Sequence, residues 1–375
     1  MPHSPDPDGL AEFSVVFTDR ALNHMSARFQ GVMRALSRSL KRVYGAHAVA
    51  IVPGGGTFAM EAVARQLTPA EGPAALVVRN GWFSFRWSQI LDAMGAPEPT
   101  VCRAAQVADA PQAPFAPPAA GAVADAIATH RPPVVFVPHV ETSAGMVVPD
   151  DWIRTVADAT HAVGGLLVLD CIASGALWVD MAELGVDVLI SAPQKGWSAP
   201  AAAGLVMLSE AATERVRATR SSSFAGDLGR WLGIMEAYEG GGHAYHATMP
   251  TDALAAFADA VAATEAFGFS AARAAQVELG ARVRALLADR GYPSVAAPGF
   301  AAPGVVVCYA PNEEVRSGRA FRAQGVQIAG GVPLRCGERA DFATFRIGLF
   351  GLDKLQDLDG TVARLAAALD GIGPA

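Results

Sequence analysis

Apolar residues between positions 21 and 209 form two alternating patterns, short uninterrupted runs and helical spacing. The runs predict buried strands at 48–53, 74–80, 134–139, 165–171, 186–192 and 204–209. Apolar residues at helical spacing predict helices at 21–45, 54–67, 83–95 and 152–164. Because strands and helices alternate and the strands are apolar throughout, the pattern predicts an α/β fold with a largely parallel sheet covered on both faces.

The pattern changes near residue 252. Two long Ala- and Arg-rich helical stretches are followed by apolar runs at 305–310 and 344–350 and by a closing helix, which indicates a smaller α+β domain. We therefore expect an N-terminal arm at 1–20, a large domain at 21–255 and a small C-terminal domain at 256–375. Residues 96–120 are rich in Pro and Ala and are expected to be irregular surface chain.

Composition narrows the class of protein. The 375 residues are 51% hydrophobic and 17% charged, enough for a large buried core. The net charge of -7 disfavours nucleic acid as a partner. Four cysteines without a CxxC pair disfavour a disulfide scaffold or a zinc site, and no metal is expected. The polar N-terminus does not resemble a signal peptide, and no apolar run approaches the ~20 residues that span a membrane. We expect a cytoplasmic enzyme.

Lysine usage singles out one position. The only lysines are Lys41, Lys195 and Lys354, and the first and last lie in polar helical segments. Lys195 follows the apolar run VDVLISA and has small or apolar neighbours. It is either a partly buried lysine whose stem packs against apolar surface, or an amine retained for chemistry that arginine cannot perform.

Three candidate groups fall at predicted strand ends. GGGT at 54–57 opens a helix, where backbone N–H groups favour an anion. Asp170 closes the strand GLLVLDC, as either a cap or the partner of a cation, and Lys195 lies shortly after the next strand. Adjacent parallel strands would bring these groups to one rim of the sheet. An anion cradle, an aspartate and a lysine suit the phosphate, ring nitrogen and aldehyde of pyridoxal phosphate.

The sequence resembles the class V, fold type I aminotransferases, particularly the alanine–glyoxylate and serine–glyoxylate branch. The resemblance runs from about His24 to the C-terminal helix. It is carried by GGGTFAMEA, NGWFSFRW, HVETSAG, LLVLDCIASGALWVDMAELGVDVLISAPQK, YHATMP and FRIGLFG. It implies a large α/β/α domain with a mostly parallel sheet and a small C-terminal α+β domain. It also implies a pyridoxal-phosphate-dependent aminotransferase that moves an amino group from a small L-amino acid, of alanine, serine or aspartate type, to a 2-oxo acid such as glyoxylate or pyruvate.

The resemblance also implies roles for individual residues. Lys195 would hold the cofactor as a Schiff base and move the Cα proton, and Asp170 would keep the ring nitrogen protonated. Phe83 would stack on the ring, with Trp82 as the alternative, and Arg346 would bind the substrate carboxylate. The other implied cofactor contacts are Gly55, Gly56, Thr57 and Gln194 at the phosphate, Thr142 and secondarily Glu141 at the ring edge, and Tyr245 and Thr248 at the phosphate of a neighbouring subunit. The last pair implies a homodimer with shared sites.

Some segments depart from the family pattern. FSVVFTDRALNHMS stands where the family often has a Gly-Pro-rich segment, Gly55 replaces the usual hydroxyl of the phosphate turn, and CIAS follows the aspartate. These departures leave the substrate open.

Three alternatives remain. Cys336, ten residues before Arg346, suggests a cysteine desulfurase or related lyase, although such enzymes usually carry His where this chain has Gln194. Epimerisation or decarboxylation would use the same cofactor. A non-enzymatic sensor would need a DNA-binding module, and the acidic charge and the mere 20 or so residues before the first predicted helix disfavour this expectation.

Overall fold

The computed structural model describes residues 10–373. Its main feature is a seven-stranded sheet in the order β1-β11-β10-β9-β6-β2-β3. The strands are β1 (Ala48–Pro53), β2 (Leu76–Arg79), β3 (Thr100–Arg103), β6 (Val134–Pro138), β9 (Leu166–Asp170), β10 (Val188–Ser191) and β11 (Ala203–Leu208). Only β11 runs antiparallel to its neighbours, β1 and β10. The expected α/β fold with a mostly parallel sheet is confirmed.

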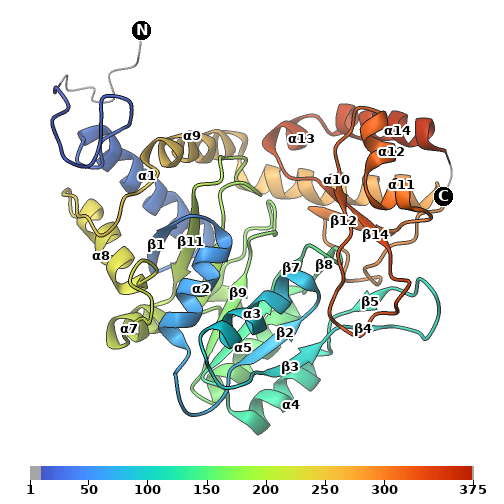
Figure 1. Ribbon diagram of the computed structural model, residues 1–375, viewed down its shortest axis with the longest axis horizontal. Helices are drawn as coiled ribbons and strands as arrows, with labels where there is room; N and C mark the ends of the chain where they lie inside the picture. Colours follow the sequence, from blue (N-terminus) through green and yellow to red (C-terminus); the bar gives the residue numbers. More distant parts are fainter. Residues whose placement is uncertain (1–9, 374–375) are drawn as a thin grey trace.

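Amphipathic helices pack against this sheet (Figure 1). They are α1 (Ala27–Tyr44), α2 (Gly56–Leu67), α3 (Trp82–Ala93), α4 (Ala120–His130), α5 (Asp150–Ala162), α6 (Met181–Leu184), α7 (Glu210–Ala218) and α8 (Leu228–Glu239). Helix α8 packs on β1, α2 on β11, α5 on β9 and α3 on β2. The strands between them are almost wholly buried, which explains their uninterrupted apolar runs.

The expectation of irregular chain at 96–120 is wrong in part. This segment contains the edge strand β3 and the two short strands β4 (Ala105–Gln106) and β5 (Phe115–Ala116), and α4 begins at its end. Strand β3 is only half-buried, so it lacks the continuous apolar run by which the other strands are recognised. Two further short strands, β7 (Val140–Glu141) and β8 (Met146–Val147), form a hairpin after β6.

The C-terminal part is built on a second, antiparallel sheet in the order β12-β14-β13 (Figure 1). Its elements are α9 (Thr251–Phe267), α10 (Phe269–Ala288), β12 (Val305–Tyr309), α11 (Glu313–Arg316), α12 (Arg319–Ala323), β13 (Ala329–Gly330), β14 (Thr344–Gly348), α13 (Leu352–Gln356) and α14 (Leu358–Ile372). The predicted division after residue 255 falls inside α9, which packs on α1, whereas α10 packs on α13 and α14. We propose that the two domains meet instead at Gly268, between these helices.

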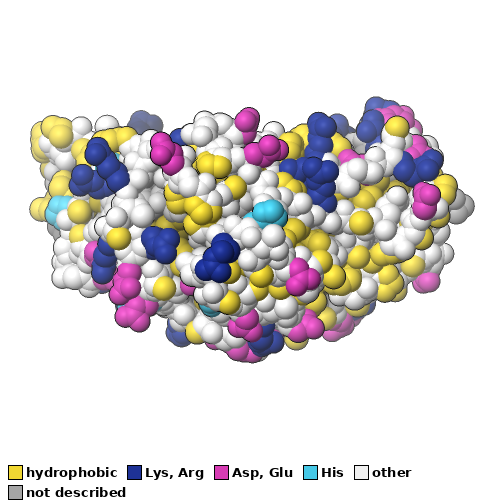
Figure 2. Space-filling view, turned by 90° about the horizontal axis from the view of Figure 1, so that it is seen from below, with side chains coloured by type: hydrophobic (Ala, Val, Ile, Leu, Met, Phe, Trp, Pro, Cys, Tyr) yellow, Lys and Arg dark blue, Asp and Glu magenta, His cyan; other side chains and the backbone are white. Residues whose placement is uncertain are grey.

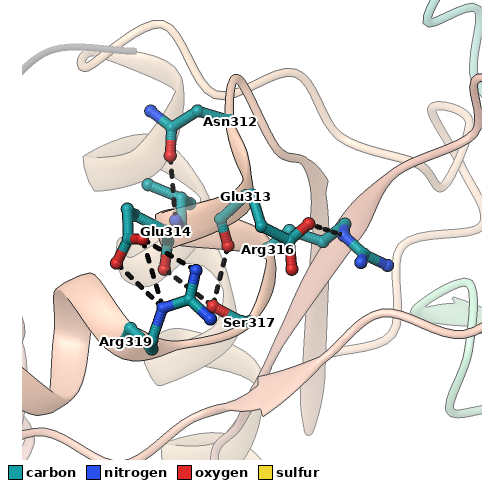
Figure 3. Close-up of polar contacts among 7 residues, drawn as sticks. Asn312, Glu313, Glu314, Arg316, Ser317 and Arg319 are labelled. Carbon is teal, nitrogen blue, oxygen red and sulfur yellow. Dashed lines mark hydrogen bonds and ion pairs between the residues drawn. The ribbon is translucent and has the colours of Figure 1, made fainter.

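Short polar contacts organise the surface around α11 and α12 (Figure 3). The Asn312 side chain caps α11 by accepting from the Val315 N–H at 3.0 Å. Arg319 donates to both carboxylate oxygens of Glu314, with the shortest contact at 2.7 Å. Exposed ion pairs of this kind contribute little to stability, so their main effect is on the local geometry.

Charge is dispersed over the face shown in Figure 2. Lysine and arginine side chains alternate there with acidic, apolar and uncharged ones, and they form no continuous basic field. Within residues 10–373 no single helix is both long and apolar enough to cross a membrane; α9 and α10 pass that test only together, and they meet at a bend of 84°.

Candidate active site

Asp170 and Lys195 lie at the same rim of the large sheet. Asp170 is the last residue of β9, which pairs in parallel with β10, and Lys195 follows β10 after a short turn. The only hydrogen bond to the Asp170 carboxylate within residues 10–373 comes from the Ile172 N–H, which donates to Oδ1 at 2.9 Å. The Lys195 Nζ makes no hydrogen bond in the same part of the chain, and it lies 5.4 Å from the centre of the Phe350 ring. Both functional groups are therefore free to bind a ligand.

Burial changes the proton affinity of both groups. It raises the pKa of Asp170 to about 7, although the nearby charges of Arg86 and Lys195 favour the carboxylate. Burial, and then the Arg346 guanidinium, lower the pKa of Lys195, while Asp170 opposes this shift. A lysine with a lowered pKa more readily presents a neutral, nucleophilic amine.

Helix α2 presents an open N-terminus to this rim. Strand β1 is antiparallel to β11, and β11 is antiparallel to β10, so β1 runs in the same direction as β10 and its carboxyl end lies at the same edge. No side chain caps α2 at Gly55, and the Gly56 and Thr57 N–H groups lie in the uncapped first turn. A Cβ on Gly56 would lie 2.4 Å from Ile172 Cδ1, so the turn packs directly against the segment that follows Asp170.

Arg86, which the sequence analysis did not single out, adds a positive charge beside this turn. Its Nη1 donates to the Thr57 hydroxyl at 2.8 Å, and its guanidinium carbon lies 5.3 Å from the Phe83 ring centre. The signal available in the sequence was its spacing: Phe83 and Arg86 are three residues apart and so share one face of α3.

Phe83 also faces the arginine expected to bind substrate. The Arg346 guanidinium carbon lies 5.5 Å from the Phe83 ring centre, and its Nε donates to the Gly330 carbonyl at 2.9 Å. Trp82, the alternative, instead lies beside Arg335 and Phe85. The structure thus brings Phe83, Arg86 and Arg346 together. The positive charge of Arg346 also lowers the pKa of Lys195.

Glu141 occupies the N-terminus of α3, where the sequence analysis expected it to line a ring edge. Its carboxylate accepts from the N–H groups of Phe83 at 3.2 Å, Ser84 at 2.9 Å and Ser143 at 3.0 Å. It also accepts from the hydroxyls of Ser84 and Ser143. Glu141 is 1% exposed, so both of its oxygens are committed inside the protein.

Ser84 and Ser143 accept hydrogen bonds from the remaining backbone N–H groups at the start of α3. The Ser84 hydroxyl accepts from the N–H groups of Asn80 and Gly81, and the Ser143 hydroxyl accepts from the N–H of Trp82. Together with Glu141 they bind five consecutive backbone N–H groups, from residue 80 to residue 84. The start of α3 is therefore closed to an anion, whereas the start of α2 is open.

The remaining candidate residues make fewer contacts. Thr142 is half-buried beside Glu141, and its hydroxyl makes no hydrogen bond within residues 10–373. Gln194 is exposed on the turn before Lys195. The Tyr245 and Thr248 hydroxyls lie 3.0 Å apart at the surface, and Tyr245 lies against His24 rather than against the Lys195 group.

A family model described as aminotransferase class-V matches residues 14–308. The chain belongs to the class V aminotransferases. The resemblance inferred from the motifs is thereby confirmed, and with it the dependence of this aminotransferase on pyridoxal phosphate, the cofactor of the family.

Curated relatives match this aminotransferase along almost its whole length. The 2-aminoethylphosphonate–pyruvate transaminase 2 of Paraburkholderia xenovorans (strain LB400) is 33% identical over 363 residues, 95% of this chain and 90% of that protein. The 2-aminoethylphosphonate–pyruvate transaminase of Burkholderia pseudomallei (strain 668) is 32% identical over 356 residues, 92% of this chain and 90% of that protein.

Solved structures confirm the fold type. The alanine–glyoxylate aminotransferase from Nostoc sp. superposes with a TM-score of 0.77 at 21% identity, covering 92% of this chain and 88% of that one. The pyridoxamine–pyruvate aminotransferase from Mesorhizobium loti gives a TM-score of 0.75 at 19% identity, with 92% and 86% covered.

The residues present fit the cofactor. Pyridoxal phosphate needs an anion site for its phosphate, an acidic partner for its ring nitrogen and an amine for its aldehyde. The open start of α2 beside Arg86, the uncommitted Oδ2 of Asp170 and the unpartnered Lys195 amine offer these three in the described part of the chain.

Proposed function

We propose that this enzyme transfers an amino group from a small primary amine with one anionic group to a 2-oxo acid of pyruvate type. The observation that carries the proposal is the pair of uncommitted groups, Asp170 and Lys195, at one rim, with Arg346 close enough to shift the pKa of Lys195. The names of the sequence relatives support pyruvate as acceptor and extend the donor class from small L-amino acids to aminophosphonates.

Each of these residues has a distinct task in this proposal. When bound, pyridoxal phosphate accepts the amino group and disperses the negative charge that develops at the donor carbon. Lys195 binds the cofactor covalently and then moves the proton at that carbon. Asp170 keeps a proton on the ring nitrogen, Phe83 packs on the ring, and Thr142 lies at its edge. Gly55, Gly56, Thr57 and Gln194 surround the phosphate, with Arg86 as an added contact.

Arg346 orients the anionic group of both substrates in this proposal. Its guanidinium offers two parallel N–H donors to a carboxylate or phosphonate, and the Gly330 carbonyl holds its Nε side. We expect Arg346→Gln to lower kcat/KM about 10- to 100-fold for both substrates, mainly by raising KM, because a hydrogen-bonded charge is lost. Steady-state kinetics with pyruvate as the varied substrate measures this. An unchanged KM would contradict the role, and Arg346→Lys should restore only part of the loss, since lysine cannot bind bidentately.

The spectrum of the purified enzyme tests the reaction itself. We expect one donor among 2-aminoethylphosphonate, L-alanine, L-serine and L-aspartate to remove the cofactor's visible band, and pyruvate or glyoxylate to restore it. Loss without restoration by any 2-oxo acid would contradict transamination and favour a lyase or epimerase.

The desulfurase alternative requires a reactive Cys336 thiolate. Burial, together with Glu141 and Glu338, raises the pKa of Cys336 to about 12, and its thiol donates to the Arg79 carbonyl at 3.3 Å. The thiol is therefore protonated at neutral pH, which disfavours this alternative. If the enzyme released sulfide from cysteine and the Cys336→Ser variant did not, the desulfurase alternative would be supported again.

Asp170 gives the cofactor-free protein a defined pH dependence. Between about pH 4 and pH 7 the folded protein keeps a proton on Asp170 that the unfolded chain has released. The contribution of Asp170 to the free energy of unfolding should therefore fall as the pH rises through this window, by up to about 4 kcal/mol. Burial lowers the pKa of His139 to about 4, so His139 contributes the opposite trend in the same window. The difference in unfolding free energy between the wild-type protein and Asp170→Asn isolates the Asp170 contribution and should decline as the pH rises, whereas the difference from Asp125→Asn, an exposed change on α4, should not. Denaturant unfolding at several pH values measures both differences, and a constant difference from Asp170→Asn would contradict the assignment.

We further propose that two copies of the chain form a dimer through the arm before α1 and the 224–246 region. Apolar side chains are exposed there: Phe13 by 92%, Phe224 by 81% and Tyr245 by 52%. Ring contacts connect these segments, from Phe17 through His24 to Tyr245 and from Phe224 to His246. Figure 1 shows the segment from residue 10 to α1 and helix α8 at the same end of the molecule. In this arrangement Tyr245 and Thr248 would reach the partner's phosphate site.

Sedimentation of the holoenzyme measures the state of association. We expect a dimer, weakened by the double change Phe13→Ser and Phe224→Ser because about 1.5–3 kcal/mol of burial is lost for each side chain. A monomer at micromolar concentration would contradict the shared site.

All four cysteines are unpaired, which supports the reducing cytoplasm as the proposed location.

A further inference from the structure

A second cavity lies on a different face of α3 from the candidate active site. It has a volume of about 410 Å³, within the usual range for small-molecule sites, and lies between β2, α3 and β3. Phe85, Ser88 and Asp92 line it from α3, at spacings of three and seven residues that define one helix face. Phe83 and Arg86 lie on another face of the helix. The cavity is therefore separated from the Lys195 group by α3 itself.

The cavity contains a buried arginine without an acidic partner. Arg79 is 8% exposed, and its Nη2 donates to the Ser88 hydroxyl at 2.9 Å. Its Nη1 makes a long contact of 3.4 Å to the Arg335 carbonyl, and its buried Nε has no hydrogen-bond partner. Arg79 forms no ion pair with any residue in the 10–373 range. A buried guanidinium without a counter-charge costs several kcal/mol, a cost that an anionic ligand would offset.

Further positive charge converges on the same place. Arg103 is opposite Arg79 in the parallel register of β2 and β3, so two arginines end adjacent strands. Arg335, on a loop that follows β13, lies outside the cavity lining but over the same Phe85 ring as Arg79. The guanidinium carbons of Arg79 and Arg335 lie 4.6 Å and 5.9 Å from the centre of the Phe85 ring. Arg79 and Arg103, side by side on adjacent strands, repel each other unless an anion lies between them.

The opposite end of the cavity is acidic. Asp92 lies one helical turn beyond Ser88 on α3, and Glu98 lies just before β3, whereas Arg103 ends that strand. Neither carboxylate forms an ion pair with an arginine of the cavity in the described part of the chain. The cavity thus has a basic end and an acidic end.

We propose that this cavity binds a small molecule with a phosphate or phosphonate group held by Arg79 and Arg103, and with a cationic group directed toward Asp92 and Glu98. Two guanidinium groups match a dianion with three terminal oxygens better than a single carboxylate. Because α3 separates this cavity from the Lys195 group, ligand binding in the cavity does not depend on which amino donor and acceptor the enzyme uses.

Two probes test the two ends of the cavity in the holoenzyme saturated with pyruvate, so that the cofactor occupies its own phosphate site and pyruvate occupies Arg346. Inorganic phosphate tests the basic end. Phosphocholine tests both ends, and its quaternary ammonium cannot serve as an amino donor. We expect saturable binding of one phosphate per chain in equilibrium dialysis, and tighter binding of phosphocholine.

Variants assign the binding to the named residues. We expect Arg79→Gln to weaken phosphate binding about 10-fold or more, because a charge-assisted hydrogen bond is lost. Arg103→Gln, an exposed change that leaves the core intact, should weaken it as well. Asp92→Asn should remove only the preference for phosphocholine. Arg322→Gln, which changes an exposed arginine on α12, should alter neither affinity.

The opposite results overturn the proposal. Phosphate that does not saturate the wild-type holoenzyme excludes the basic end as a site. Unchanged affinity in both Arg79→Gln and Arg103→Gln places any binding elsewhere, and if Arg79→Gln fails to fold, Arg103→Gln decides. Phosphocholine that binds no more tightly than phosphate contradicts the role of the acidic end and leaves inorganic phosphate itself as the ligand.

Discussion

Lys195→Ala should reduce transamination by about 10⁴-fold, because the change removes both the amine that holds the cofactor and the group that moves the donor proton. The environment of Lys195 supports this expectation. Burial lowers the pKa of Lys195, and its amine has no hydrogen-bond partner within residues 10–373. Single-turnover kinetics with excess donor measures the rate of the amino-transfer half-reaction.

Lys354→Ala is the matched control for this experiment. Among residues 10–373, the Lys354 amine pairs with the exposed Asp353 alone, so Lys354 should be dispensable. A normal rate in Lys195→Ala would refute the assignment, and a similar loss in both variants would indicate damage to the fold instead. Unfolding curves of the two variants distinguish these outcomes.

Glu141→Ala should destabilise the protein by about 2–6 kcal/mol. It leaves the two buried N–H groups of Ser84 and Ser143 without an acceptor, at about 1–3 kcal/mol for each, and it also frees the partly buried N–H of Phe83. Because Phe83 loses the contact that fixes its backbone, the circular dichroism of the bound cofactor should change as well. Denaturant unfolding and the visible dichroism band measure the two effects.

Glu141→Gln provides a graded comparison. It keeps one acceptor oxygen and should recover part of the stability, since Gln can accept at Oε1 but not at Nε2. Glu61→Ala, which removes a half-exposed ion pair with Arg65 on α2, should cost less than about 1 kcal/mol. If the free energy of unfolding of Glu141→Ala is within about 1 kcal/mol of the wild-type value, the hydrogen bonds of Glu141 do not stabilise the start of α3.

The sequence predicted the parts of this fold that depend on burial. Strands such as 134–139 and 186–192 are covered on both faces, so their apolar runs predicted their positions to within about two residues. The half-buried edge strand β3 was missed because a strand with one neighbour needs no such run. The shared rim of Asp170 and Lys195 followed from the order of adjacent parallel strands, which the pairing of β9 with β10 confirms.

The role of Glu141 at the start of α3 could not be predicted from the sequence. Its partners at Phe83 and Ser84 are separated from it by 58 and 57 positions, and only the folded sheet brings them together. Arg86 was missed for a related reason. Its contact with Thr57 joins the starts of two helices, and no local pattern encodes the distance between them.

The pairing of β1 with β11 has a consequence for how the enzyme acquires its cofactor. Ala48 is opposite Leu208, so the strand that leads into α2 finds its partner only 160 residues later in the chain. Contacts of such long sequence separation form slowly, because a large loop must close first. During synthesis, the amides of α2 cannot join Asp170 and Lys195 until β11 has left the ribosome. We therefore expect cofactor loading to follow completion of the large sheet.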